Sequence, residues 1–148
     1  MDFPQRVLIV DDDPIQRAVL KQIFLTHGSA TVETAADGRD SISIIEREID
    51  PFDLIVLDLV MPEYDGIRLI SYLEGQNVKT RLLVISGLPK DVVRMSNSLA
   101  EASGLTSIGS LQKPLHLEDL LAIIHGQKWP RRKTPKPAVD PILQLGHV

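Results

Sequence analysis

Short apolar runs that each end in a reactive polar residue constrain the fold of this chain more than any other feature. The runs and the residues that follow them are 7–10 before Asp11-Asp12-Asp13, 54–57 before Asp58, 82–85 before Ser86, and 110–112 before Lys113. Runs this short are typical of parallel strands that are covered on both faces. The pattern predicts an open α/β sheet whose reactive groups meet along the edge formed by the carboxyl ends of the strands.

Helix-like segments alternate with these strands. The predicted strands are 7–10, 31–35, 54–57, 81–85 and 107–111, and the predicted helices run from 14 to 27 or 28, 38–49, 67–74, 89–104 and 117–124. The strand at 31–35 alternates only weakly and is expected at an edge of the sheet. Strand-helix units with short connections predict right-handed crossovers, and therefore a doubly wound parallel sheet with helices on both faces.

The first two helices have apolar faces that we expect to be buried. In the first helix, Asp13 is the expected N-cap and Pro14 suits the first turn. The residues expected to be buried in that helix are Ile15, Val19, Leu20, Ile23 and Phe24. The expected stripe of the second helix is Ile42, Ile45 and Ile49.

Composition limits the class of protein. The length of 148 residues fits one ordinary domain, and the formal charge of −4 gives no reason to expect a nucleic-acid surface. With no cysteine, the chain has no disulfide or thiol nucleophile. The first residues lack the pattern of a signal peptide, and no apolar stretch approaches a membrane span. We expect a soluble cytoplasmic protein.

The composition changes near residue 128. Residues 128–137 are basic and rich in proline, with no period that would form a core, so this segment is typical of a stiff linker. We therefore expect a domain over residues 1–127 and a linker or tail over 128–148. Trp129 favours a tether onto the domain, because its large ring is amphipathic.

The acidic residues at the strand ends indicate phosphoryl chemistry assisted by a metal. Asp11, Asp12 and Asp58 would converge, and carboxylates this close repel one another unless a cation compensates or one stays protonated. Oxygen ligands with no nearby His or Cys favour Mg²⁺. Lys113 would supply a positive charge to a phosphate or to Asp58, and the Ser86 hydroxyl could donate to a phosphoryl oxygen.

Taken in order, these features resemble the receiver domain of bacterial two-component response regulators, of the chemotaxis-regulator type. The resemblance covers about residues 6–125. The residues that carry it are Asp11-Asp12, Asp58, Met61-Pro62, Asp65-Gly66, Ser86-Gly87 and Lys113-Pro114. It implies a flavodoxin-like strand order of 2-1-3-4-5.

The resemblance also implies a metal site and a phosphoacceptor. Asp58 would be phosphorylated by a sensor histidine kinase or a phosphotransfer protein. Asp12, Asp58 and the backbone carbonyl of Val60 would be ligands of Mg²⁺, and Asp11 would be oriented around a metal-bound water. Ser86 and Lys113 would hold the phosphate, and the peptide bond between Lys113 and Pro114 would be cis. The chain would catalyse only its own phosphorylation and dephosphorylation.

Three positions depart from the usual pattern of the family. Ser110 stands where receivers commonly place an aromatic switch residue, and Val60 and Leu88 occupy the two positions that often tune the lifetime of the phosphate. The resemblance further implies an output domain or target protein that contacts the fourth helix, the fifth strand and the fifth helix. No contact with nucleic acid or membrane is expected from this domain.

Two other functions stay open at this point. A haloacid-dehalogenase-like phosphatase would use Asp11 and Asp13 in an Asp-x-Asp motif, followed by Ser86 and Lys113, and would leave Asp58 without a role. Alternatively, a receiver-like module could act only in docking, without phosphorylation. Mg²⁺-dependent labelling with a small phosphodonor would separate the docking module from the others, and persistence of the label would separate a receiver from a phosphatase.

Overall fold

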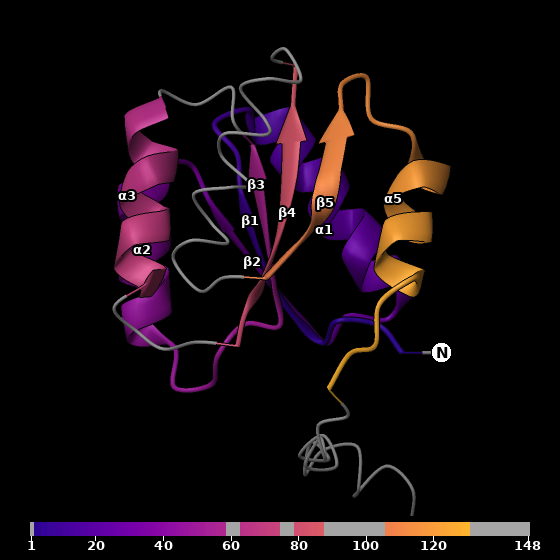
Figure 1. Cartoon of the computed structure of the whole chain (residues 1–148), viewed down its shortest axis with the longest axis horizontal. Coiled ribbons are helices and arrows are strands. Elements are labelled where there is room, and N and C mark those ends of the chain that lie inside the picture. Colours follow the sequence, from indigo (N-terminus) through magenta and orange to yellow (C-terminus); the bar gives the residue numbers. More distant parts are fainter. Residues whose placement is uncertain (1, 59–62, 75–78, 88–105, 131–148) are drawn as a thin grey trace, which may run out of the picture.

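In the computed structural model, strands of the described residues form one parallel sheet in the order β2-β1-β3-β4-β5, with helices on both faces (Figure 1). The structure describes residues 2–58, 63–74, 79–87 and 106–130. The elements are β1 (Arg6–Val10), α1 (Pro14–His27), β2 (Thr31–Ala35), α2 (Gly38–Arg47), β3 (Leu54–Asp58), α3 (Glu63–Glu74), β4 (Arg81–Ser86), β5 (Thr106–Gln112) and α5 (Leu117–His125). The predicted doubly wound parallel sheet is confirmed.

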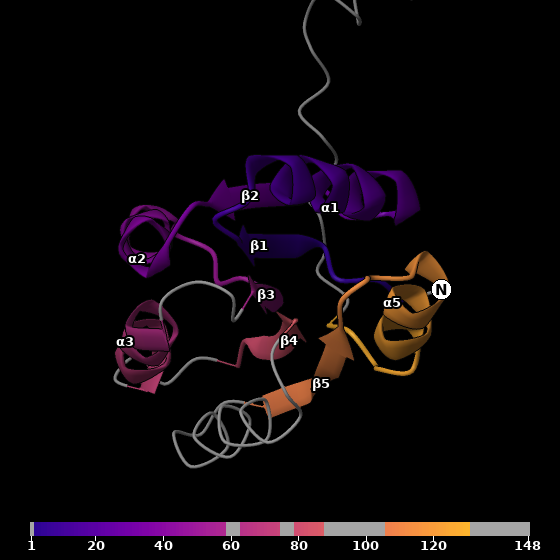
Figure 2. The ribbon, with the colours of Figure 1, turned by 90° about the horizontal axis from the view of Figure 1, so that it is seen from above.

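The sheet divides the core into two layers. Figure 2 shows α1 and α5 on one face of the sheet and α2 and α3 on the other. All positions of β3 are buried, since this central strand is covered on both faces and flanked by β1 and β4. Within the described part of the chain, no helix has both the length and the apolar character needed to cross a membrane.

The expected elements agree with the observed ones except at several ends. The third helix begins at Glu63, earlier than the predicted Ile67. In β5, Gly109 has φ +139°, a backbone conformation that favours glycine, and the pairing register between β4 and β5 shifts at this point. The predicted fourth helix at 89–104 lies outside the described residues.

The expected buried face of α1 is wrong in its first half. Ile15 is 75% exposed and Val19 is 52% exposed, whereas Leu20 and Phe24 are buried and Ile23 is partly buried. Consecutive residues of a helix lie about 100° apart around its axis, so the 15/19 stripe points well away from the 20/24 stripe. The sheet covers only the narrower stripe, and the other side of α1 faces solvent.

The expected stripe of α2 is also wrong at its end. Ile49 is 98% exposed, because the helix ends at Arg47 and the backbone of Glu48 is already extended. Ile44 is the buried isoleucine of this helix, and Ile42 and Ile45 pack against the core from partly buried positions.

Trp129 packs in the core although it follows the end of α5. Its ring is 4% exposed, and its Nε1 donates a hydrogen bond to the carbonyl of Ile124 at 2.9 Å. The guanidinium of Arg81 lies over the ring, 4.8 Å from its centroid, and Arg81 also donates to the carbonyl of Lys128. The chain is therefore held against the start of β4 by the ring that the sequence suggests as a tether.

Candidate functional site formed by three carboxylates

The parallel strands bring the acidic residues to one edge of the sheet. Asp11 and Asp12 follow β1 directly, and Asp58 is the last residue of β3. These two strands are neighbours, and Val10 pairs with Leu57 in the residue before each acidic position. All neighbouring strands of the sheet pair in parallel, as the arrows of β4 and β5 show in Figure 1, so their carboxyl ends lie together.

The three carboxylates lie within reach of one cation. One carboxylate oxygen from each of Asp11, Asp12 and Asp58 lies within 4.8 Å of the others. Asp11 is 1% exposed and Asp58 is 2% exposed, whereas Asp12 is exposed to solvent. The group therefore has a buried floor and one side that a solvated ligand can approach.

Lys113 reaches the same group from the end of β5. Its Nζ donates to Oδ2 of Asp58 at 2.8 Å, the short distance expected of a charge-assisted hydrogen bond. Its backbone N donates to the carbonyl of Ser86 at 2.9 Å, which ties the loop after β5 to the end of β4. The peptide bond between Lys113 and Pro114 is cis, as the family resemblance implies. Ser86 is fully buried at the end of β4.

Asp11 is held firmly but keeps one carboxylate oxygen without a partner. Its backbone N donates to the carbonyl of Ala35 at 3.0 Å, and its Oδ1 accepts from the backbone N of Asp13 at 2.8 Å. Its Oδ2 is buried and has no hydrogen-bond partner. Burial, together with the negative charge of Asp58, raises the pKa of Asp11 to about 6.

This donor set fits a hard divalent cation. A buried carboxylate oxygen without a partner is costly, and a cation or a cation-bound water would satisfy it. The donors are carboxylates, with an open side that leaves room for water ligands, as Mg²⁺ requires. Asp11, Asp12 and Asp58 could therefore hold Mg²⁺, which would also relieve their mutual repulsion.

Asp13 and Arg17 have local structural roles where the acidic loop leads into α1. The Asp13 side chain accepts from the backbone N of Ile15 at 2.9 Å, which confirms Asp13 as the N-cap of α1. Arg17, which the sequence reasoning missed, donates from Nη1 to the carbonyl of Asp11 at 2.7 Å. Its position one helical turn after the acidic run is the only sequence signal that could have indicated this contact.

Of the three positions that depart from the family pattern, only Ser110 lies among the described residues. Ser110 is exposed within β5, where it pairs with Val84. Val60 and Leu88, which occupy the two positions expected to tune the lifetime of the phosphate, lie outside the described residues, as does the Val60 carbonyl predicted as a metal ligand.

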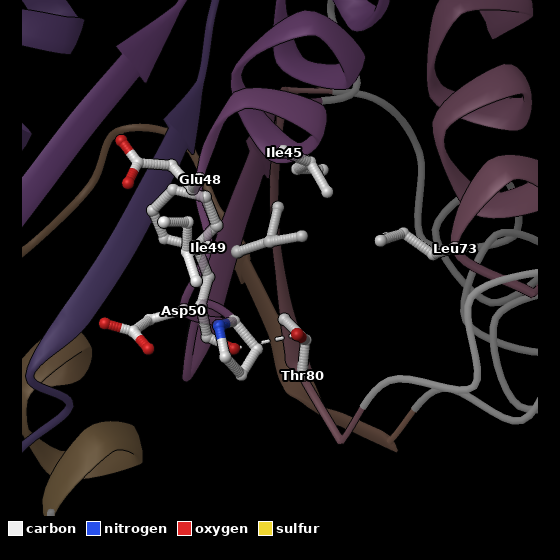
Figure 3. A pocket seen from close by; sticks show the side chains of 9 residues that line it. Ile45, Glu48, Ile49, Asp50, Leu73 and Thr80 are labelled. Carbon is white, nitrogen blue, oxygen red and sulfur yellow. Dashed lines mark hydrogen bonds between the residues drawn. The ribbon is translucent and has the colours of Figure 1, made fainter.

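A cavity of about 190 Å³ lies at the opposite end of the strands from the carboxylates, between α2 and α3 (Figure 3). It is lined mainly by apolar side chains, and the Thr80 hydroxyl in its wall donates to the carbonyl of Phe52 at 2.7 Å. Phe52 and Thr80 precede β3 and β4, so this cavity adjoins the amino ends of the strands. None of the three clustered carboxylates lines it, which leaves the carboxyl edge as the candidate site.

Comparison with known proteins identifies the family of this chain. Residues 7–125 match the response regulator receiver domain family. Response regulator MprA of Mycolicibacterium vanbaalenii is 33% identical over 133 residues, which cover 90% of this chain and 53% of that protein. The chain spans about half the length of this protein and of two transcriptional regulatory proteins of Mycobacterium tuberculosis, TcrA and TrcR, that it also matches.

Solved structures of similar proteins have the same fold. A response regulator from Colwellia psychrerythraea is 32% identical, with a TM-score of 0.69 and coverage of 82% of this chain and 94% of that one. A CheX-CheY-BeF3-Mg²⁺ complex from Borrelia burgdorferi has a chain that is 29% identical, with a TM-score of 0.69 and coverage of 84% and 89%. These matches do not favour the phosphatase alternative. The chain belongs to the response regulator receiver domains, the phosphorylation-dependent signalling modules of two-component systems.

Proposed function

We propose that Asp58 is the phosphoacceptor of this receiver. The observation that carries the proposal is the meeting of three carboxylates within 4.8 Å, with the Lys113 ammonium 2.8 Å from Asp58. A carboxylate oxygen of Asp58 attacks the phosphorus of a phosphohistidine on a sensor kinase or phosphotransfer protein. The new P–O bond forms as the P–N bond breaks, and the imidazole leaves and takes up a proton.

The acidic group also supports a magnesium site. Asp12, Asp58 and the Val60 carbonyl are the proposed direct ligands, with Asp11 acting through a metal-bound water. Bound Mg²⁺ supplies positive charge that offsets the charge on the phosphoryl oxygens. The buried Oδ2 of Asp11 supports this role. It has no hydrogen-bond partner, and a metal-bound water could donate a hydrogen bond to it.

Lys113 and Ser86 are proposed to hold the phosphoryl group after transfer. The ammonium of Lys113 already forms an ion pair with the Asp58 carboxylate. A small movement of the lysine side chain would therefore be enough to pair it with a phosphoryl oxygen on Asp58. The hydroxyl of Ser86 can donate to another of these oxygens from the end of the adjacent strand. In this scheme the chain acts on its own Asp58 and on no other substrate.

Incubation with acetyl phosphate and Mg²⁺ tests the assignment. Intact mass should show one added phosphoryl group in the wild-type chain, and none in Asp58→Asn or in the presence of excess EDTA. Asp50→Asn is the matched control, since Asp50 is exposed at the other edge of the sheet. Full labelling of Asp58→Asn would move the phosphoacceptor elsewhere.

The same labelling experiment separates the alternative functions. A docking module would take up no label, and a phosphatase would release it as fast as it forms. A label that persists for minutes after removal of the phosphodonor, and is lost in Asp58→Asn, supports the receiver function.

The proposed output is a conformational change passed in the cytoplasm to a further domain or target protein. Ser86 ends β4 and is followed by Gly87-Leu88-Pro89, so movement of its hydroxyl toward the phosphate would pull on this stretch and on the start of the fourth helix. The output contact is proposed for the fourth helix, β5 and α5. Hydrogen-exchange changes on adding beryllofluoride and Mg²⁺ should concentrate in residues 86–104, and a response confined to α1 would contradict this route.

A further inference from the structure

Arg17 connects the first turn of α1 to the acidic loop. Its Nη1 donates to the backbone carbonyl of Asp11 at 2.7 Å, and its backbone N donates to the carbonyl of Asp13 at 3.0 Å. The side chain is partly buried. Within the described part of the chain, no carboxylate forms an ion pair with this guanidinium, so the contact to the neutral carbonyl is its main bond.

This bond completes the anchoring of Asp11. The backbone N of Asp11 is bound by Ala35, its Oδ1 by Asp13, and its carbonyl by Arg17. The atom that remains is Oδ2, which is buried and has no hydrogen-bond partner. One carboxylate oxygen of Asp11 lies within 4.8 Å of those of Asp12 and Asp58. Without the guanidinium, the peptide plane between Asp11 and Asp12 loses a fixed point, and both carboxylates gain freedom to turn away from a shared cation.

We propose that Arg17 is a positioning residue for the divalent cation of this receiver. It acts through the Asp11 carbonyl and does not contact the cation. The inference rests on the proposed function, because it assumes that the three carboxylates hold Mg²⁺. Groups that orient metal ligands in this indirect way commonly change metal affinity by about 10- to 100-fold when they are removed.

The sign of the effect separates positioning from simple electrostatics. Arg17 and Mg²⁺ are both cations, so removal of the guanidinium charge alone should make Mg²⁺ bind more tightly. Loss of the hydrogen bond to Asp11 should make Mg²⁺ bind more weakly, because the carboxylates are no longer held in place. The two explanations therefore predict opposite changes in the dissociation constant.

Calorimetric titration of Mg²⁺ into the full chain measures this constant. Arg17→Met should raise the Mg²⁺ Kd by about 10-fold. Arg17→Lys keeps the charge and a hydrogen-bond donor, so its Mg²⁺ Kd should lie between those of Arg17→Met and the wild type. Lys21→Met is the matched control, because it removes the same charge from an exposed position of the same helix without touching Asp11, and its Kd should equal or fall below that of the wild type.

A second readout guards against a purely structural effect. In acetyl phosphate labelling, Arg17→Met should raise the Mg²⁺ concentration needed for half-maximal rate, while saturating Mg²⁺ restores most of the maximal rate. Arg17→Gln, which is too short to reach the carbonyl, replaces Arg17→Met if circular dichroism shows that the latter is unfolded.

Each outcome decides one proposal. An Arg17→Met or Arg17→Gln chain that binds Mg²⁺ as tightly as the wild type, or more tightly, overturns the positioning role and leaves the proposed function intact. A wild-type chain that binds no Mg²⁺ overturns the magnesium site itself.

Discussion

The ammonium of Lys113 lies 2.8 Å from Oδ2 of Asp58, although 55 residues separate them in the chain. The carboxylate is 2% exposed and the lysine side chain is 27% exposed, so the pair is shielded on the side of Asp58 and open on the side of Lys113. The same carboxylate belongs to the group with Asp11 and Asp12. Asp58 is therefore balanced between one cationic partner and two acidic neighbours.

This balance predicts the effect of Lys113→Met. Without Mg²⁺, the variant should be less stable to unfolding by about 1–3 kcal/mol, since a buried carboxylate loses a charged partner. Urea unfolding measures the loss, with Lys79→Met as a control that removes an exposed lysine near the opposite edge of the sheet. Acetyl phosphate labelling of Lys113→Met should also be slower. Unchanged stability and labelling in Lys113→Met would show that the pair has no role.

The raised pKa of Asp11 predicts how stability depends on pH. The folded chain without metal holds a proton on Asp11 up to about pH 6, whereas the unfolded chain loses it near the ordinary value of 3.8. The folded state therefore binds more protons between these values, and this contribution to stability falls as pH rises from about 4 to 6. Mg²⁺ replaces the proton, so the stabilisation by Mg²⁺ should be larger at pH 7.5 than at pH 5.

Melting curves with and without Mg²⁺ at the two pH values check this prediction. At a free concentration about 100 times its Kd, a ligand stabilises the folded state by about 2.7 kcal/mol. Asp11→Asn removes the titrating group and should abolish the difference between the two pH values. An Mg²⁺ effect in the wild type that is equal at both would show that Asp11 does not exchange its proton for the metal.

Val60 and Leu88 predict a long-lived phosphoryl group. Their apolar side chains cannot orient an attacking water by hydrogen bonding, and they would shield the phosphate from solvent. Val60→Asn and Leu88→Glu should each speed the loss of label from Asp58, measured by intact mass after removal of the phosphodonor. Equal decay rates in both variants and the wild type would mean that these side chains do not control access of water.

Trp129 predicts where the folding unit ends. A chain truncated after Pro130 should unfold like the full chain, whereas truncation after Gln127 removes a buried ring and should cost about 2–4 kcal/mol. Because Trp129 is the only tryptophan, its fluorescence in the folded chain reports this site alone. Arg81→Gln keeps the ring and removes the cation above it, so it should lower the free energy of unfolding by less than truncation after Gln127 does.

If the chain truncated after Gln127 is as stable as the full chain, the Trp129 ring contributes nothing to stability. That result would support the domain boundary expected at residue 127. Asp58 labelling should persist in both truncated chains, since Ile124 and the site residues remain.

Much of the fold was accessible from local sequence patterns. Apolar runs of strand length, followed by polar residues, determined which segments become buried strands and which side chains stand at their ends, because burial and turn preferences act over a few residues. The cap formed by Asp13 is local in the same sense, since its side chain reaches a backbone N only two residues away.

Contacts between distant segments were decided by the tertiary structure. The side of α1 that faces the sheet depends on how the helix is rotated against β1 and α5, and its apolar residues alone favoured a wider stripe that includes the exposed Ile15 and Val19. The buried position of Trp129 depends on the start of β4 lying beside the end of α5. The bond from Arg17 to Asp11 spans only six residues, but it depends on the path of the chain between the end of β1 and α1. The sequence by itself determined which chemical groups are delivered to the edge of the sheet, and only the packed fold decided which of their atoms are held and which are left to bind a ligand.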